Sequence, residues 1–310
     1  MAGSAAAHAA VKRELLVRYL DAWAPAALHG ARKATFVLGY AVTADDSAVA
    51  ALRVFGEFAD LLARHKLTVV VLAPDSDGLA SQLDAVRQEL GAPPGLSVRP
   101  VIGPLDAVRD ELAAIGASSG AVLAYLDTAG GAAPPSDAVA AVARSKAGEV
   151  LVTMDPLEAP EVDKYRTTLR KAGFEHVTHV ELVDTTGAAQ LLVYATTSAK
   201  HADRFKDALW AVDEYAGVRY RDPRDREHSL LDISLAPPLG PLRRALLDRI
   251  AEAGECTVAE LRDHTVAETV YRAADATKVL TALATSGAII REPGKGRLTP
   301  ETRIRPARKG

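Results

Sequence analysis

The sequence predicts an α/β protein: a Rossmann-type, doubly wound sheet followed by a small C-terminal domain. Short apolar runs alternate with helical periods along most of the chain, and this pattern changes after about residue 238. The length of 310 residues accommodates one sizeable core and a smaller second one. A composition of 48% hydrophobic and 25% charged residues is that of a folded globular chain rather than a disordered one.

The first predicted element is a helix over residues 12–23. Leu15, Tyr19 and Trp23 recur at intervals of four, which places them on one face of the helix. Residues 1–11 are rich in alanine and lack the apolar segment of a signal peptide. We therefore expect them to form a disordered tail.

Five short apolar runs predict the strands of a parallel sheet. They are too apolar for strands with one exposed face, which is typical of strands buried on both faces. The runs are residues 36–39, 68–73, 97–102, 121–126 and 149–154. Apolar residues at intervals of three and four, such as Leu79, Leu83 and Val86, predict helices between them. Repeated alternation of strand and helix indicates a doubly wound sheet.

Two further strands close the predicted sheet. They cover residues 176–184 and 190–197, and the short Thr-Thr-Gly turn between them allows only an antiparallel hairpin. A parallel sheet that ends in an antiparallel hairpin is typical of class I methyltransferases, although a hairpin can also decorate another α/β fold. We predict such a methyltransferase-like domain over residues 12–214.

The C-terminal part of the chain predicts a winged helix-turn-helix domain over residues 239–310. A charged and Pro-rich stretch, residues 215–238, precedes it and is interpreted as a linker. Three helices are expected: one marked by leucines from Leu242, one that opens with a capping box at Thr257, and one capped by Asp275. Strands over 288–291 and 297–299 then flank a Gly-Lys-Gly tip, the predicted wing.

Charge and cysteine content limit the function classes. Residues 239–310 carry 13 Lys and Arg against 9 Asp and Glu, a balance of +4. Because the net charge of the whole chain is −3, the preceding residues carry −7. A basic terminal domain is suited to contact with a polyanion. The lone Cys256 excludes an intramolecular disulfide and a Cys-rich zinc site, which favours a reducing, cytoplasmic setting. No apolar stretch is long enough to predict a membrane span.

Four segments resemble the three-Cys-motif partner (TcmP) family. They are Lys12-Arg-Glu-Leu-Leu-Val-Arg-Tyr-Leu20 with Ala22-Trp23, Glu149-Val-Leu-Val152, Lys206-Asp-Ala-Leu-Trp-Ala-Val-Asp213 and Arg221-Asp-Pro223. The resemblance implies an S-adenosylmethionine-dependent methyltransferase-like domain with a C-terminal winged helix. It also implies a partner protein that bears three cysteines and resembles radical-SAM photoproduct lyases.

The chain departs from this family where the chemistry is expected. Family members begin the sheet with a sequence like Tyr-Ile-Asp-Gly-Phe-Ala-Gly-Pro-Gly; here Leu38 replaces the acid, and Val42 and Ala44 replace two glycines that allow close approach of the cofactor. Ala73 stands at the end of the second strand in place of the Glu that would bind the ribose, with Asp75 two residues away as a candidate substitute.

The fourth strand shows a third departure. The expected Asp-Pro-Phe-Gly is Asp127-Thr-Ala-Gly130, which lacks the aromatic residue. The sequence therefore predicts a catalytically degenerate protein without a bound cofactor. Asp127 remains as a vestigial catalytic candidate, and Gly39 and Asp75 remain as vestigial cofactor-binding candidates.

Two functional hypotheses follow. The first is a pseudo-methyltransferase that acts as a DNA-associated or partner-binding scaffold. The second is an active S-adenosylmethionine-dependent nucleic-acid methyltransferase with an atypical cofactor site. No metal site is predicted. The candidate DNA contacts, which could equally be the solvated surface of a protein-docking domain, are Arg272, Lys278, Thr281, Arg291, Lys295 and Arg297.

Overall fold

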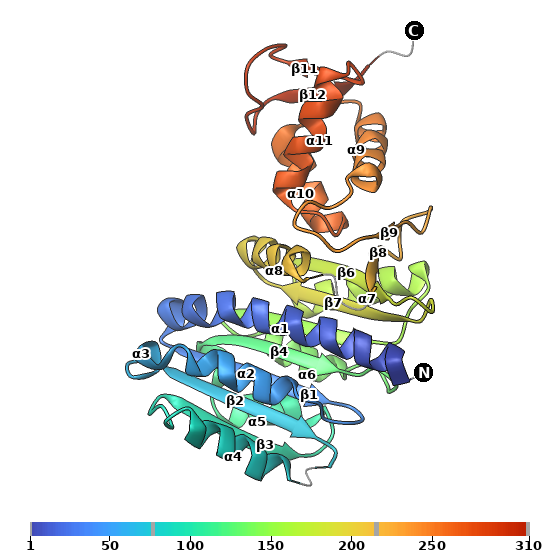
Figure 1. Cartoon of the computed structure of the whole chain (residues 1–310). Coiled ribbons are helices and arrows are strands. Elements are labelled where there is room, and N and C mark those ends of the chain that lie inside the picture. Colours follow the sequence, from blue (N-terminus) through green and yellow to red (C-terminus); the bar gives the residue numbers. More distant parts are fainter. Residues whose placement is uncertain (1, 76–77, 214–216, 308–310) are drawn as a thin grey trace.

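A nine-stranded mixed sheet forms the centre of the larger unit (Figure 1). The computed structural model describes residues 2–75, 78–213 and 217–307. The strand order is β3-β2-β1-β4-β5-β7-β6-β8-β9. Five neighbouring strands are parallel: β1 (Lys33–Tyr40), β2 (Lys66–Ala73), β3 (Leu96–Ile102), β4 (Ala121–Asp127) and β5 (Ala147–Met154). The prediction of an α/β protein with a Rossmann-like sheet is confirmed.

The predicted hairpin is also present. Strand β7 (Ala189–Thr196) lies between β5 and β6 (His176–Val183) and is antiparallel to both. The turn between β6 and β7 is held by Asp184, whose Oδ1 accepts hydrogen bonds from the backbone N–H groups of Thr186 and Ala188. The sheet is thus parallel on one side and antiparallel on the other.

Helices cover both faces of the sheet and bury two apolar layers. One layer lies under α1 (Ala2–Ala31), α2 (Ser47–Gly56), α3 (Ala59–Leu62), α4 (Leu79–Glu89) and α8 (Ala199–Ala211). The other lies under α5 (Ala107–Ala114), α6 (Ser136–Ala143) and α7 (Ala159–Ala172), with the short 3₁₀ helix η1 (Ala117–Ser119). Alternate residues of the strands supply both layers, as expected for strands buried on two faces.

Helix α1 is longer than the sequence predicts. It begins at Ala2, so the expected disordered tail is wrong for residues 2–11. Ala7, His8 and Val11 are buried, and His8 Nε2 lies 3.0 Å from the carbonyl oxygen of Leu182 on β6. Alanine has the highest helix propensity, so an Ala-rich segment extends a helix that packs on the sheet.

A buried carboxylate fixes the position of α1. Glu149 of β5 has no exposed surface, and its Oε1 accepts a hydrogen bond of 2.8 Å from Trp23 Nε1. The hydroxyl groups of Tyr19 and Tyr194 donate to Oε2, and His201 Nδ1 lies 3.0 Å from Oε1. Such partners are required because an unpaired buried carboxylate is very costly. Helices α1 and α8 therefore meet strands β5 and β7 at this carboxylate.

The stretch expected to be a linker contributes two short strands to the sheet. Residues 214–216 lie outside the described residues, but β8 (Arg219–Arg221) pairs with β6, and β9 (Leu230–Leu231) pairs with β8. Tyr220 and Leu231 are buried. The sequence did not predict these two strands, because many charged residues and prolines surround their few apolar residues.

The C-terminal unit contains three helices and a small sheet. The helices are α9 (Gly240–Ala253), α10 (Val258–Glu268) and α11 (Ala273–Thr285); the strands are β10 (Cys256–Thr257), β11 (Ile289–Glu292) and β12 (Arg303–Pro306), in the order β10-β12-β11. The capping box of Thr257 and Glu260 is formed. The last strand lies further along the chain than the predicted 297–299, because Ile304 supplies the buried apolar residue of the hairpin.

Candidate functional site

The carboxyl edge of the parallel strands holds the residues predicted from the methyltransferase resemblance. Asp127 ends β4 and pairs in register with Tyr40, the last residue of β1. Its Oδ2 lies 2.7 Å from Nζ of the buried Lys12 on α1, and its Oδ1 accepts a hydrogen bond of 3.1 Å from the backbone N–H of Ala129. The carboxylate is therefore engaged in holding a helix and a turn in place.

Gly39 and Asp75 also lie at this edge, with different surroundings. A Cβ atom at Gly39 would come within 2.5 Å of Leu105 Cδ2 and 3.1 Å of Leu126 Cδ2. The space beside this glycine is therefore filled by the protein's own leucines. Asp75 follows Pro74 after β2 and is exposed. Val42, which replaces a family glycine, is 53% exposed.

A hollow of about 470 Å³ lies beside these residues at the same edge. Glycine, alanine and proline line most of it, together with Leu105 and the carboxylate of Asp106. The loops that follow β1, β2, β3 and β4 all contribute to its wall. It is an apolar depression with one charged side chain in its lining.

A second candidate region is the junction between the α/β unit and the C-terminal unit. Lys206 of α8 has no exposed surface. Its Nζ donates hydrogen bonds to the carbonyl oxygens of Val266 and Thr269, both at 2.6 Å, and Tyr271, at 3.0 Å, and it lies 3.3 Å from that of Thr265. These carbonyls end α10 and begin the following loop, where a helix leaves acceptors unpaired and favours a cation. Burial lowers the pKa of Lys206 to about 7.

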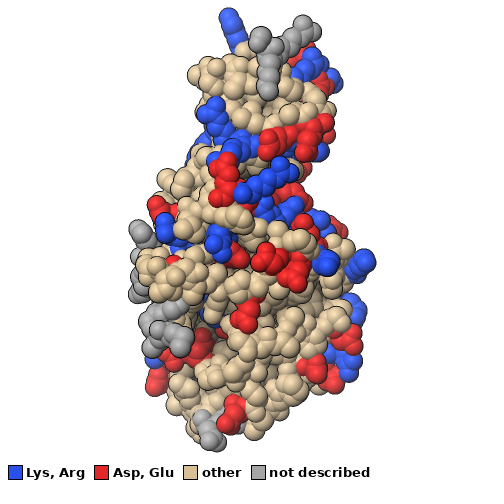
Figure 2. Space-filling view, turned by 90° about the vertical axis from the view of Figure 1, so that its right-hand side faces the viewer, with Lys and Arg blue, Asp and Glu red and all other residues tan. Residues whose placement is uncertain are grey.

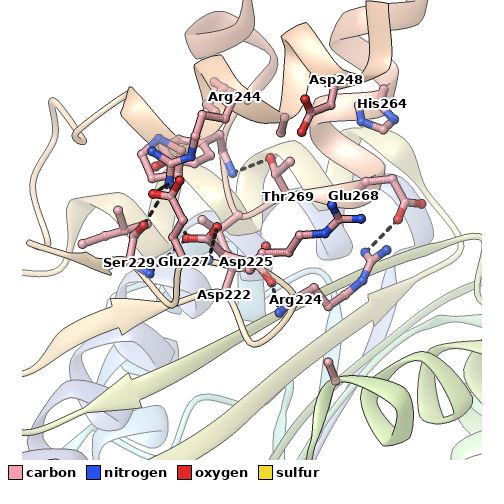
Figure 3. A pocket seen from close by; sticks show the side chains of 18 of the residues that line it. Asp222, Arg224, Asp225, Glu227, Ser229, Arg244, Asp248, His264, Glu268 and Thr269 are labelled. Atoms are coloured by element: carbon pink, nitrogen blue, oxygen red, sulfur yellow. Dashed lines mark hydrogen bonds and ion pairs between the residues drawn. The ribbon is translucent and has the colours of Figure 1, made fainter. Parts of the chain in front are cut away.

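An ion-pair cluster continues the junction (Figure 3). Glu268, at the end of α10, accepts from Arg166 and Arg224 at 2.9 Å and from Arg170 at 3.1 Å. Burial alone would raise the pKa of Glu268, but these arginines lower it to about 2. Trp210 adds a hydrogen bond of 3.0 Å from its indole Nε1 to the carbonyl oxygen of Val270.

A cavity of about 600 Å³ opens beside this cluster (Figure 3). Its charged groups mostly contact one another: Arg244 lies 2.9 Å from Glu227 and 3.0 Å from the hydroxyl of Ser229, and Asp222 lies 3.2 Å from His179. The contacts of Arg244 join α9 to the loop between β8 and β9, whereas the contact of Asp222 with His179 lies within the α/β unit. Among the described residues, no group of three His, Cys, Asp or Glu side chains is arranged to hold a metal ion.

The six predicted nucleic-acid contacts do not behave alike. Arg272 caps α11: its Nε lies 2.8 Å from Asp275, and its Nη2 donates to the carbonyl oxygen of Leu235. Arg291 donates to the carbonyl oxygens of the loop between β11 and β12, among them those of Pro293 at 2.9 Å and Gly296 at 2.8 Å. Both arginines therefore have structural partners.

The other four face the solvent. Lys278 is exposed on α11 and lies 3.2 Å from Asp275, and the exposed Thr281 donates to the carbonyl oxygen of Thr277. Lys295 and Arg297 are exposed in the loop between β11 and β12. Lys278 and Thr281 lie one turn apart and share one face of α11.

The sequence interpretation assigned no role to Lys206 and Glu268. A signal existed for Lys206, because it shares the apolar face of α8 with Phe205 and Leu209, where a lysine needs buried partners. Its partners could not be identified, since they lie about 60 residues away. Glu268 gave no signal in the sequence, because its three arginines come from α7 and from the loop after β8.

Comparisons with known proteins give little guidance. Models of known protein families and curated proteins yield no match. Among solved structures, the chain is similar to one described as "Crystal Structure of EvdMO1", with 16% identity and a TM-score of 0.34. The match covers 59% of this chain and 42% of that protein, so it spans less than half of EvdMO1. Of the described residues, no helix is long and apolar enough to span a membrane.

Proposed function

We propose that this protein is a methyltransferase-like scaffold that has lost methyl transfer and binds duplex DNA through a C-terminal winged helix. The observation that carries the first part is the ion pair of 2.7 Å between Lys12 and Asp127. In this ion pair, Lys12 binds the carboxylate that stands where the resemblance implies a catalytic acid. The TcmP-type partner with three cysteines remains a prediction from the resemblance.

The surroundings of Gly39 support the loss of methyl transfer. A family glycine leaves room for the cofactor, whereas Leu105 fills the space next to this one. No carboxylate ends β2, because Ala73 stands there. A ribose bound at this position would lack an acceptor for its hydroxyl groups, and poorly paired polar groups cost about 1–3 kcal/mol each.

The arrangement of α10, α11 and the β11–β12 hairpin supports the winged helix. Helix α11 would enter the major groove with Lys278 and Thr281, and the exposed Lys295 and Arg297 of the wing would contact the adjacent phosphates. Arg291 would act indirectly, because its guanidinium organises the wing loop through backbone carbonyls. This changes the role predicted for it from the sequence.

The alternative, an active nucleic-acid methyltransferase, is favoured by the hollow of about 470 Å³ at the carboxyl edge. Charge opposes it. The described residues of the loops over 41–46, 74–78, 103–106, 128–135 and 155–158 include six Asp and Glu and no Lys or Arg. A polyanionic substrate would have to approach an edge of its own sign.

Two titrations test the proposal with the full chain. Isothermal calorimetry with S-adenosylmethionine should show no binding at micromolar concentrations; saturable binding there would restore the enzyme. Fluorescence anisotropy with a labelled duplex should show binding that weakens steeply with salt, because each phosphate contact releases counterions. The absence of binding at low salt would refute the DNA part.

Charge variants make the DNA test specific. Replacing Lys295 and Arg297 by alanine should lower affinity for all sequences and reduce the slope of log K against log salt by about two. A matched control replaces the exposed Lys164 and Lys171 of α7, which lie on the other unit. Equal effects of the two double variants would contradict a site on the wing.

A further inference from the structure

The carboxyl edge of the sheet has an unusual charge content. The described residues of the five loops that follow the parallel strands include no basic residue, and they include six acidic ones: Asp45, Asp46, Asp75, Asp106, Asp155 and Glu158. Figure 2 looks onto this edge; the middle of its lower half is mainly uncharged surface with separate acidic groups. Two basic residues of α1 are nearby: Lys12 is buried and paired with Asp127, and the exposed Arg13 lies 3.5 Å from Asp46.

Helix dipoles offset only part of this charge. Acidic residues are common before helices, and five helices, α2, α4, α5, α6 and α7, begin after these strands. Each N-terminus contributes about half a positive charge, or roughly +2.5 in total. The six described loop carboxylates exceed this even though Asp46 is paired with Arg13, so the edge keeps a negative field that attracts cations and repels anions.

The same edge has an apolar centre. The hollow of about 470 Å³ is lined mainly by small apolar residues. Val42 lies at its rim, since its Cγ2 is 3.4 Å from where a Cβ of Gly131 would be, and it is 53% exposed. Ile102, next to the lining residue Gly103, is 68% exposed. Exposed aliphatic side chains around a hollow, with charge at the periphery, are typical of a binding surface.

We propose that this edge binds a basic segment of a partner protein. One aliphatic or aromatic side chain of that segment occupies the hollow, and flanking lysines or arginines face the loop carboxylates. Charge complementarity selects this occupant: a nucleotide or an acidic peptide would meet like charge, and a purely apolar ligand would not use the carboxylates. The proposal rests on the proposed scaffold function, because methyl transfer would need the same edge for a cofactor.

The test uses the full chain and labelled peptides in fluorescence anisotropy at low salt. The probe is Gly-Arg-Lys-Gly-Leu-Gly-Lys-Arg-Gly, and the two control peptides carry Gly in place of Leu or Glu in place of every Lys and Arg. We expect saturable binding of the probe, at least tenfold weaker binding without the leucine, and none of the acidic peptide. No saturable binding of the probe, or equal binding without the leucine, would overturn the proposal.

Protein variants locate the surface. Replacing Asp106, which lines the hollow, and Asp46, in the loop after β1, by asparagine removes two exposed loop charges and should weaken probe binding about tenfold. The matched control, Glu57→Gln with Asp60→Asn, removes two exposed charges at the start of α3 and should leave binding unchanged. Equal weakening in both double variants would indicate attraction by net charge alone and refute a site at this edge.

A competition experiment separates this inference from the proposed function. S-adenosylmethionine should not displace the bound probe. Displacement would mean that a cofactor occupies the hollow, and both proposals would then fail. If neither the probe nor the cofactor binds, the scaffold function stands and only the basic partner is refuted.

Discussion

Replacing Lys206 by methionine should destabilise the junction between the C-terminal unit and the α/β unit. Methionine keeps the apolar stem of the buried side chain but removes the ammonium group, which can donate to three carbonyls at once. The acceptors lie at 2.6, 2.6 and 3.0 Å, with a fourth at 3.3 Å. The variant would leave these carbonyls of α10 and its following loop without a donor.

The expected loss follows from the number of unpaired groups. Three buried acceptors at about 1–3 kcal/mol each set the gross cost. Methionine also avoids the desolvation cost of a buried ammonium group, and this gain offsets part of the loss. We expect a net loss of about 3 kcal/mol in the free energy of unfolding. Urea denaturation followed by tryptophan fluorescence measures it, because Trp210 lies at the same junction.

A control and a pH series make this test decisive. Lys200→Met changes an exposed lysine of the same helix and should alter stability by less than about 0.5 kcal/mol. The folded pKa of Lys206 is about 7 and its ordinary value is 10.5, so between these values the unfolded chain binds a proton that the folded chain does not. Wild-type stability should therefore rise with pH above 7, by up to about 1.4 kcal/mol per unit, relative to Lys206→Met. Equal stability of Lys206→Met and Lys200→Met would refute this account of the junction.

Two further predictions concern Glu268 and Gly39. Because arginines lower the pKa of Glu268 to about 2, its contribution is complete above about pH 4.5 and is lost as pH falls toward 2. Glu268→Gln should lower the free energy of unfolding by about 1–2 kcal/mol at pH 7, after allowance for solvent screening, and by much less at pH 3. Urea unfolding measures both values, with the exposed Glu252→Gln as control. A loss independent of pH would contradict the ion-pair explanation. Gly39→Ala should cost about 1–3 kcal/mol, because the new Cβ would crowd Leu105. Gly30→Ala, which has nothing within 4 Å, should be neutral or stabilising in the same thermal or urea measurement.

The sheet could be predicted because its signal is local. Runs such as 68–73 and 121–126 are continuous and apolar, and a strand buried on two faces requires such a run. The end of the chain was harder. Strand β12 depends on Ile304 alone among charged neighbours, so the predicted second wing strand was placed too early. Helix α1 was predicted too short because alanine gives no amphipathic pattern even when it packs against a sheet.

The candidate sites depend on contacts that local patterns do not encode. Asp127 was identified as a strand-end residue, but its partner Lys12 lies 115 positions earlier and was noted only as part of a resembling segment. Arg291 was interpreted as a phosphate contact because it is basic and near a glycine-rich tip. Its hydrogen bonds to backbone carbonyls depend on how the loop between β11 and β12 folds.

The segments that suggested a family are informative about architecture rather than chemistry. Tyr19 and Trp23 from one segment donate hydrogen bonds to the buried Glu149 of another. Lys206 of a third segment donates to a backbone carbonyl near the end of α10. Replacing any of these residues would expose a buried polar group to an apolar interior, so each is constrained by the fold whatever the protein does. Leu38, Val42 and Ala73, which stand where the resemblance implies cofactor contacts, carry no polar side chain that the fold must pair. Such motifs therefore identify an architecture rather than a chemistry, and binding measurements at the carboxyl edge and at the β11–β12 hairpin test the function that we propose.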